Sequence, residues 1–344
     1  MTGPPNKPSL PSSDPLARLS NPDALAKGWE GLNRKITLID PAELASHVKS
    51  KVIGQDEVVD SICTRLHRRM AAKRLNKPIA VFCFAGAPGV GKSYLAEVLA
   101  EKLYGDRKHY HFIEMAKFDQ QHSASTLFGS PKGYVGSNEP GRIPRMLRDV
   151  PNSIMVLDEF EKAHRSIHSQ FLSAWNDGFV TEISDGSQYP TNETIFILTA
   201  NSGQRRIAEY ARDKNASQED LNKFARTALR DDNFAPEVLS RIDDVFAFRE
   251  LTGLDIARVV ALEIEKAARS YSLEIAGQGI DAEILLGAID EFTRNAPAGG
   301  VREIARHIED KIADGLIDAR TAGATHVMFE ADGPDVRVVA VPQE

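Results

Sequence analysis

The chain has 344 residues, which corresponds to about two domains at the usual ~150 residues each. Hydrophobic residues make up 42% of it and charged residues 26%, a composition typical of a globular protein that buries a core. The formal net charge of −7 argues against a general electrostatic attraction to nucleic acid or to an anionic membrane surface.

The cysteines and the apolar runs exclude further classes of protein. The two cysteines, Cys63 and Cys83, lack the spacing of metal ligands or of a disulfide framework. The longest strongly apolar run, Ile79–Ala85, is far shorter than a membrane span. The N-terminus lacks the basic-then-apolar pattern of a signal sequence. We therefore expect a cytoplasmic protein that has neither a membrane nor a nucleic acid as its partner.

The N-terminal segment is rich in proline. The first 22 residues contain six of the 18 prolines, mixed with Ser and Asn. Such a segment buries too little apolar surface to offset its ordering entropy, so residues 1–39 are predicted to form a disordered leader. A passive tail is the favoured interpretation, and a tail that docks onto a partner is the alternative.

Helical and strand patterns alternate after Asp40. Apolar residues at three- and four-residue steps predict helices with one buried stripe, and short continuous apolar runs predict strands covered on both faces. The helical stripes are Val58–Met70 and Leu95–Leu103, and the strand runs are Ile79–Ala85, Ile154–Leu157 and Ile195–Leu198. This alternation predicts an α/β fold with a parallel sheet and helices on both faces.

The pattern changes near Leu251. Helical periodicity fills residues 255–270, 281–293 and 301–319, and alternating segments at 326–330 and 336–341 predict a small hairpin. We therefore expect a large α/β domain at residues 40–250 and a small α+β, mainly helical, domain at residues 251–344.

Residues 86–93 fit the pattern G-x-x-x-x-G-K-[ST] between a predicted strand and a predicted helix. Its glycines allow backbone N–H groups to surround a phosphate, and the helix N-terminus adds a favourable dipole. Lys92 is expected to reach the β- and γ-phosphates of ATP, and Ser93 to bind Mg²⁺. A chance glycine turn is the alternative, which the strand–turn–helix context disfavours. The candidate nucleotide-binding residues are Gly86, Ala87, Pro88, Gly89, Val90, Gly91, Lys92 and Ser93.

Two carboxylates follow the predicted strand Ile154–Leu157. Asp158 is expected to hold Mg²⁺ through water, and Glu159 to orient and deprotonate the attacking water. Alone, such a pair usually marks a strand entering a polar loop, but after a phosphate loop it indicates hydrolysis. Asn201 follows another strand run at the sheet edge where ligands bind, so it is a candidate for positioning that water, with a turn residue as the alternative.

From about Val52 to Val341 the chain resembles an AAA+ module of the Clp chaperone family, in particular the second ATPase module of ClpB and ClpA. The matching stretches are Val52-Ile53-Gly54-Gln55, residues 86–93, Gly133-Tyr134-Val135-Gly136, Asp158-Glu159-Phe160-Glu161-Lys162-Ala163-His164, Phe234-Ala235-Pro236-Glu237 and Arg241-Ile242-Asp243. The third and fourth stretches are specific to this family. The resemblance implies a nucleotide-binding domain at residues 40–250 and a lid domain at residues 251–344.

The resemblance also implies roles for residues outside the phosphate loop. Val52 and Ile53 would pack against adenine, although ordinary burial would explain them as well. Arg241 matches the arginine finger that reaches a neighbouring subunit's ATP, worth on the order of 10³-fold in rate. Arg302 matches the sensor arginine of the lid, where the family has Gly-Ala-Arg and this chain has Gly-Val-Arg. Each arginine taken alone could be a solvated surface charge. The implied partner is the chain itself in a ring, expected to be a hexamer.

Tyr134 and Val135 lie between Gly133 and Gly136, which free the backbone to move. A tyrosine offers a large amphipathic face with few rotamers. In the family, this aromatic residue projects into the central pore and grips an extended polypeptide; a surface turn is the alternative. Residues 177–188 match the region of a second pore loop.

The favoured function is therefore an ATP-dependent unfoldase or remodelling chaperone that uses Mg²⁺ and threads a protein substrate through the Tyr134 loop. Between Asn201 and Phe234 the chain lacks the Ile-Gly-Leu or Ile-Gly-Phe tripeptide of family members that dock onto ClpP, so such docking is not expected. A second ATPase module, a substrate-binding N-domain and a coiled-coil insert are not expected either. A nucleotide-gated assembly module that threads nothing is the alternative. A DNA-processing AAA+ protein is disfavoured by the acidic balance.

Overall fold

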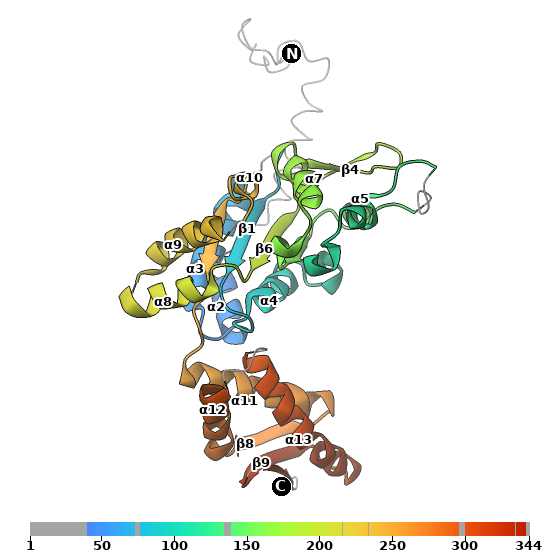
Figure 1. Cartoon of the computed structure of the whole chain (residues 1–344). Helices are drawn as coiled ribbons and strands as arrows, with labels where there is room; N and C mark the ends of the chain where they lie inside the picture. Colours follow the sequence, from blue (N-terminus) through green and yellow to red (C-terminus); the bar gives the residue numbers. More distant parts are fainter. Residues whose placement is uncertain are drawn as a thin grey trace, which may run out of the picture.

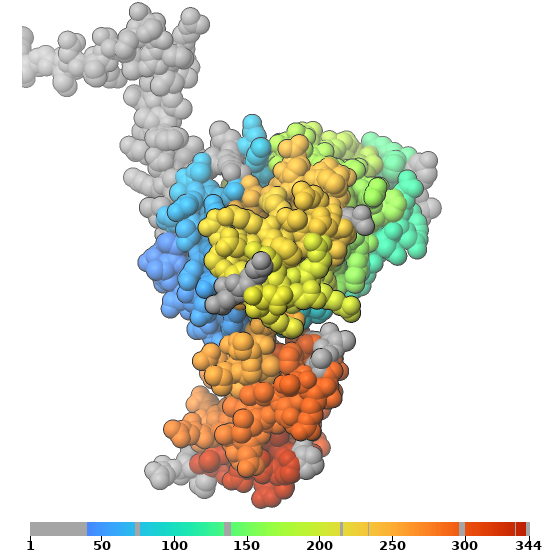
Figure 2. All heavy atoms as spheres, turned by 60° about the vertical axis from the view of Figure 1, so that its left-hand side comes forward, coloured from blue at the N-terminus to red at the C-terminus, as the bar shows by residue number. Residues whose placement is uncertain are grey.

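The computed structural model describes residues 40–72, 76–133, 139–214, 216–232, 234–295, 300–333 and 335–341. The predicted leader and the pore-loop residues Tyr134 and Val135 lie outside these residues. A large α/β part is followed by a smaller part (Figure 1), and a waist separates the two in the space-filling view (Figure 2). Among the described residues, no helix is long and apolar enough to cross a membrane.

A five-stranded sheet forms the centre of the large part, in the order β2-β3-β6-β1-β7. Its strands are β1 (Ala80–Ala85), β2 (Tyr110–Glu114), β3 (Ile154–Asp158), β6 (Ile195–Ala200) and β7 (Asp244–Ala247). All neighbouring strands pair in parallel. Every residue of β1 and β6 is buried, as a continuous apolar run predicts for a strand covered on both faces. The predicted parallel sheet and its three central strands are confirmed.

Helices cover both faces of this sheet (Figure 1). They are α2 (Pro41–Lys51), α3 (Asp56–Ala72), α4 (Lys92–Tyr104), α5 (Ala124–Phe128), α6 (Arg142–Asp149), α7 (Arg165–Asn176), α8 (Gln204–Lys214), α9 (Gln218–Asp231) and α10 (Pro236–Leu239), and a short hairpin of β4 (Phe179–Thr181) and β5 (Gln188–Pro190) follows α7. Alternate residues of β1 enter opposite cores: Phe82 and Phe84 pack with α2, α3 and α4, whereas Val81 and Cys83 pack with α7 and α9.

The smaller part combines three helices with a second sheet. Its elements are α11 (Gly253–Ser270), β8 (Glu274–Ile280), α12 (Ala282–Asn295), α13 (Val301–Thr321), β9 (His326–Asp332) and β10 (Asp335–Val341). The predicted hairpin is present as the antiparallel pair β9 and β10. The sequence missed β8, which adds a third strand parallel to β9. Gly277 and Gly279 lie in this strand and weaken its sequence pattern, since glycine is depleted in strands.

Candidate functional site

The turn from β1 into α4 has the geometry of an anion site. Gly86 and Gly91 have φ values of 149° and 96°, which side-chain-bearing residues rarely adopt. A Cβ atom on Gly86 would lie 2.8 Å from the backbone oxygen of Phe248. Gly91 is the N-cap of α4 and supplies no side-chain cap. The first N–H groups of this helix therefore remain available to an anion held by the turn.

The Lys92 ammonium lies inside this turn, with only 7% of the residue exposed. Its Nζ donates to the backbone oxygens of Gly86 and Ala87 at 2.7 and 2.8 Å, and to Asn201 Oδ1 at 2.8 Å. Burial lowers the pKa of Lys92 to about 8, and the nearby carboxylates of Asp158 and Glu161 partly oppose that shift. The turn thus contains a buried cation that joins β1, α4 and the end of β6.

Two hydroxyl groups meet one carboxylate oxygen beside the turn. Ser93 Oγ donates to Asp158 Oδ1 at 2.8 Å, and Thr199 Oγ1 donates to the same oxygen at 2.7 Å. No group of three or more His, Cys, Asp and Glu residues in the described chain could hold a metal ion. A hydroxyl and a single carboxylate nevertheless fit Mg²⁺, which keeps several waters and binds through few protein oxygens together with phosphates.

Glu159 adopts a left-handed backbone conformation, with φ 54° and ψ 50°. Its N–H donates to Thr199 Oγ1 at 2.9 Å, its Oε1 accepts from Asn201 Nδ2 at 2.8 Å, and its Oε2 accepts from Lys162 Nζ at 2.7 Å. Such strained residues persist only where surrounding contacts hold them, and they concentrate at functional sites. Here the contacts hold the carboxylate of Glu159 between Asn201 and Lys162.

Three further residues take part in these contacts and have no role predicted from the sequence. Thr199 lies buried in the apolar strand β6. A polar residue within an apolar run was the feature of the sequence that could have indicated its role. Glu161 accepts from the backbone N–H of Asn201 at 2.8 Å, and burial raises its pKa. Glu161 and Lys162 lie in the quoted stretch after Asp158, but a linear pattern does not show which partners they contact.

A cavity of about 640 Å³ adjoins the phosphate turn and reaches α11 and α13. Its lining includes Val52, Ile53, Gly89, Val90, Gly91, Tyr94, Leu251, Val259, Leu262, Arg302 and Ala305. A Cβ atom on Gly300, just before α13, would lie 3.1 Å from the Cα atom of Gly89. The start of α13 therefore lies directly against the phosphate turn, and Arg302 in its first turn lines the same cavity as the turn's glycines.

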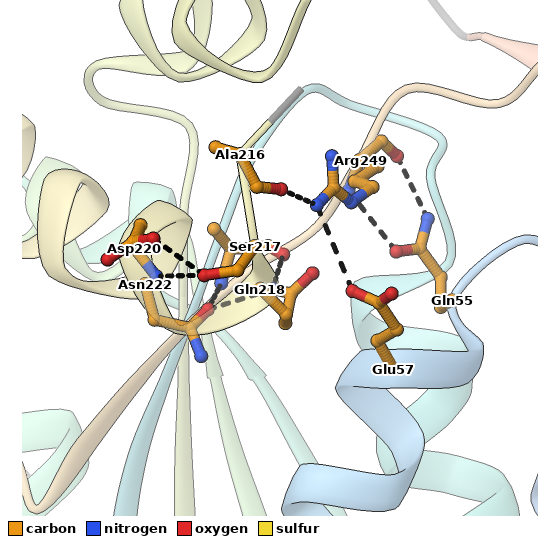
Figure 3. A network of polar contacts seen from close by, with 9 residues as sticks. Gln55, Glu57, Ala216, Ser217, Gln218, Asp220, Asn222 and Arg249 are labelled. Atoms are coloured by element: carbon orange, nitrogen blue, oxygen red, sulfur yellow. Dashed lines mark hydrogen bonds and ion pairs between the residues drawn. The ribbon is translucent and has the colours of Figure 1, made fainter. Parts of the chain in front are cut away.

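The segment between β7 and α11 is held by a buried glutamine (Figure 3). Gln55, only 2% exposed, pairs with both backbone groups of Arg249: Nε2 donates to its oxygen at 2.9 Å, and Oε1 accepts from its N–H at 3.2 Å. The Arg249 guanidinium donates to the backbone oxygen of Ala216 at 2.7 Å and lies 3.8 Å from the Glu57 carboxylate. The cavity wall at Ile53 and the segment between the two parts are thereby joined through Gln55.

Arg241 lies apart from this constellation. It is exposed, it follows α10, and it borders a small polar cavity with Lys77 and Asn176 instead of the 640 Å³ cavity. The structure thus brings Lys92, Ser93, Asp158, Glu159 and Asn201 together at one end of the sheet, and it does not bring Arg241 to them.

Comparison with known proteins agrees with this geometry. Residues 77–245 match the family "AAA domain (Cdc48 subfamily)". Chaperone protein ClpB of Rhodopirellula baltica is 31% identical over 297 residues, covering 84% of this chain and 33% of the relative. ClpB of Bacillus cereus is 31% identical over 322 residues, covering 91% and 36%. The ATP-dependent Clp protease ATP-binding subunit ClpE of Bacillus subtilis is 32% identical over 304 residues, covering 86% and 42%.

The fold, the phosphate turn and the family match define an AAA+ domain. Its similarity to ClpB and ClpE over most of its length places the chain in the Clp family of AAA+ proteins. The chain spans about a third to two fifths of the length of these relatives.

Nucleotide affinity is expected to depend on the charge of Lys92. Since the pKa of Lys92 is lowered to about 8, the side chain loses its proton as the pH rises through that value, and its attraction for phosphate is lost with it. The dissociation constant of a fluorescent ATP analogue should therefore rise about tenfold from pH 7 to pH 9. Lys102→Met, on the exposed side of the same helix, should keep this dependence, and Lys92→Met should lose it. A flat profile in the unsubstituted chain would contradict the expectation.

Thr199→Val is expected to slow ATP hydrolysis with little effect on nucleotide affinity. It keeps the side-chain shape but removes the hydroxyl that orients both Asp158 and the Glu159 backbone. A hydrogen bond to a charged group is worth about 1.5–3 kcal/mol, or about 10- to 100-fold in kcat if fully used in the transition state. Thr199→Ser should restore the rate. Wild-type kcat in the valine variant would show that Thr199 positions nothing in the reaction.

Proposed function

We propose that this chain is the ATP-hydrolysing subunit of a homo-oligomeric ring, a hexamer, that unfolds or remodels protein substrates. The supporting observation is that Arg241 lies apart from the other candidate catalytic residues of its own chain. Lys92, Ser93, Asp158, Glu159 and Asn201 converge at one end of the sheet, whereas Arg241 is exposed elsewhere. An arginine that lies outside its own subunit's cavity is available to a neighbouring subunit.

In this proposal the chain binds ATP at the turn between β1 and α4. The backbone N–H groups of residues 86–91, other than Pro88, and the Lys92 ammonium bind the phosphates. Val52 and Ile53 in the cavity wall receive the adenine, and Arg302 contacts the γ-phosphate. Residues 40–250 then act as the nucleotide-binding domain and residues 251–344 as its lid.

Hydrolysis in this proposal depends on the two adjacent carboxylates. Ser93 and Asp158 hold Mg²⁺, which neutralises charge on the phosphate oxygens. Glu159 accepts a proton from the attacking water, and Asn201 holds the Glu159 carboxylate in place through the 2.8 Å hydrogen bond. Since the arginine finger can contribute on the order of 10³-fold or more, a subunit without a neighbour is expected to be a poor ATPase.

Protein substrates are proposed from the relatives and from the sequence of the pore loop. The relatives are named as a chaperone and as the ATP-binding subunit of a protease. Tyr134 and Val135 between their glycines are proposed to grip an extended polypeptide. Docking onto ClpP forms no part of the proposal, because the expected tripeptide is absent between Asn201 and Phe234.

Ring formation can be tested by steady-state ATP hydrolysis at increasing protein concentration. The specific activity should rise steeply with concentration, because each site needs Arg241 from a neighbour, and Arg241→Ala should be inactive at every concentration. Glu159→Gln provides the control that binds ATP without hydrolysing it. A specific activity that is independent of concentration while the protein remains monomeric in analytical ultracentrifugation would contradict the ring.

Threading can be tested separately at Tyr134. Tyr134→Ala should retain basal ATPase activity and lose both its response to an unfolded model protein and the unfolding of a tagged fluorescent protein, because it removes the aromatic face that contacts the polypeptide. Tyr134→Phe should retain both activities. If the alanine variant behaves like wild type, the loop does not grip substrate, and the nucleotide-gated assembly module becomes the better description.

A further inference from the structure

Helix α9 contacts the chain on both sides of Arg241 through one polar face. Gln218, Asn222 and Arg226 are four residues apart and therefore share that face. Gln218 Nε2 donates to the backbone oxygen of Ala247 at 2.8 Å, and Asn222 Oδ1 accepts from the Ala247 N–H at 2.8 Å. Figure 3 shows these side chains at the start of α9, beside the strand that follows Arg241. The helix is thereby fixed relative to β7.

Arg226, two turns further along α9, binds the backbone immediately around Arg241. Its Nη1 donates to the oxygen of Leu239 at 2.8 Å, and its Nη2 donates to the oxygen of Ile242 at 2.8 Å. Leu239 is the last residue of α10, a helix of four residues. Because the helix ends there, no later turn supplies an N–H group to the Leu239 carbonyl. The rigid fork of a guanidinium suits two carbonyls at a fixed separation. Arg226 therefore bridges the end of α10 and the residue after Arg241 through a side chain that belongs to another helix.

Backbone hydrogen bonds also hold the chain around Arg241, since the N–H groups of Arg241 and Ile242 donate to the oxygen of Val238 at 2.9 and 3.2 Å. The N–H of Asp243 donates to the oxygen of Val81 at 2.8 Å, and the Asp243 carboxylate lies 2.7 Å from Arg69. The Arg241 side chain, by contrast, has no hydrogen bond or ion pair with any part of the chain that the structure describes. These contacts therefore fix the backbone position from which the Arg241 side chain extends.

We propose that Arg226 is a positioning residue for Arg241, fixing the backbone from which Arg241 reaches the nucleotide of a neighbouring subunit. This inference rests on the proposed function, in which Arg241 acts between subunits. Misplacing a catalytic group by about 1 Å can cost on the order of 10²-fold in rate. An arginine that acts across an interface is sensitive to such a change, because no contact within its own subunit corrects its position.

The protein is expected to fold without Arg226. The guanidinium borders a cavity of about 520 Å³ that Arg65, Lys223 and Asp244 also line. Water in that cavity can bind the backbone oxygens of Leu239 and Ile242 once the guanidinium is removed. The hydrogen bonds are then replaced, but the fixed spacing that the fork imposes is lost.

The first test compares Arg226→Met, Arg226→Lys and Lys223→Met. Arg226→Met should lower the ATPase rate of the assembled protein about 10²-fold without changing the affinity for a fluorescent ATP analogue or the melting temperature by more than a few degrees. Arg226→Lys keeps the positive charge but lacks the planar fork of the guanidinium. Its ATPase rate should therefore lie between that of the wild type and that of Arg226→Met. Lys223, one turn away on α9 and in the same cavity, pairs with Glu219 and does not contact the Arg241 segment. Lys223→Met should retain wild-type activity.

The decisive test mixes inactive subunits. Glu159→Gln subunits retain an intact Arg241, and Arg226→Met subunits retain an intact Glu159, so a mixed ring contains complete sites wherever the two meet in the right order. In a 1:1 mixture about a quarter of the interfaces of a head-to-tail ring are complete, so about a quarter of wild-type activity should return. Arg241→Ala mixed with Glu159→Gln should recover to the same extent.

The two mixtures distinguish a failure of this inference from a failure of the proposed function. If the Arg241→Ala mixture recovers activity and the Arg226→Met mixture does not, Arg226 acts on its own subunit's site or fold and the inference is overturned. Wild-type activity in Arg226→Met alone would overturn it equally. If neither mixture recovers although the subunits exchange, Arg241 does not act between subunits, and the proposed function fails together with this inference.

Discussion

The arrangement of the site depends on one buried positive charge. A buried ammonium costs several kcal/mol unless acceptors surround it, so the fold must bring oxygens to Lys92. It does so from two directions, with the carbonyls of Gly86 and Ala87 in the turn after β1 and with the side chain of Asn201 at the end of β6. The same lysine thereby fixes the turn that can hold a phosphate and the residue that contacts Glu159.

A second constraint separates two neighbouring carboxylates. Asp158 is the last residue of β3, and Glu159 follows it directly in the chain. The left-handed backbone of Glu159, which Thr199 stabilises through the Glu159 N–H, turns its carboxylate toward Asn201 and Lys162, whereas the Asp158 carboxylate stays with Ser93 and Thr199. The two carboxylates can therefore act separately. Asp158 contacts Ser93 in α4, and Glu159 contacts Asn201 at the end of β6.

The sequence predicted those features that are local and missed those that depend on distant partners. The phosphate turn and the buried strands β1, β3 and β6 each occupy a continuous stretch with its own pattern. Thr199 contacts Asp158 across 41 positions, and Gln55 contacts Arg249 across 194, so no window of sequence contains either pair. The edge strand β2 was missed because only Ile113 of its five residues is buried, which removes the apolar signal.

The contacts around Arg241 continue into the segment that joins the two parts of the chain. Arg226 holds residues 239 and 242, Asn222 and Gln218 hold Ala247, and Gln55 holds Arg249 beside the cavity wall. Every one of these is a hydrogen bond between a side chain and the backbone, at distances of 2.8–2.9 Å. Such bonds fix the path of the chain whatever the exposed side chains do. Residues 239–247 are thereby tied to α9 and, through the pairing of β7 with β1, to the central sheet, whereas Arg249 is tied to Gln55 ahead of α3. One continuous, hydrogen-bonded stretch of chain therefore leads from the Arg241 segment to Leu251, which lines the 640 Å³ cavity.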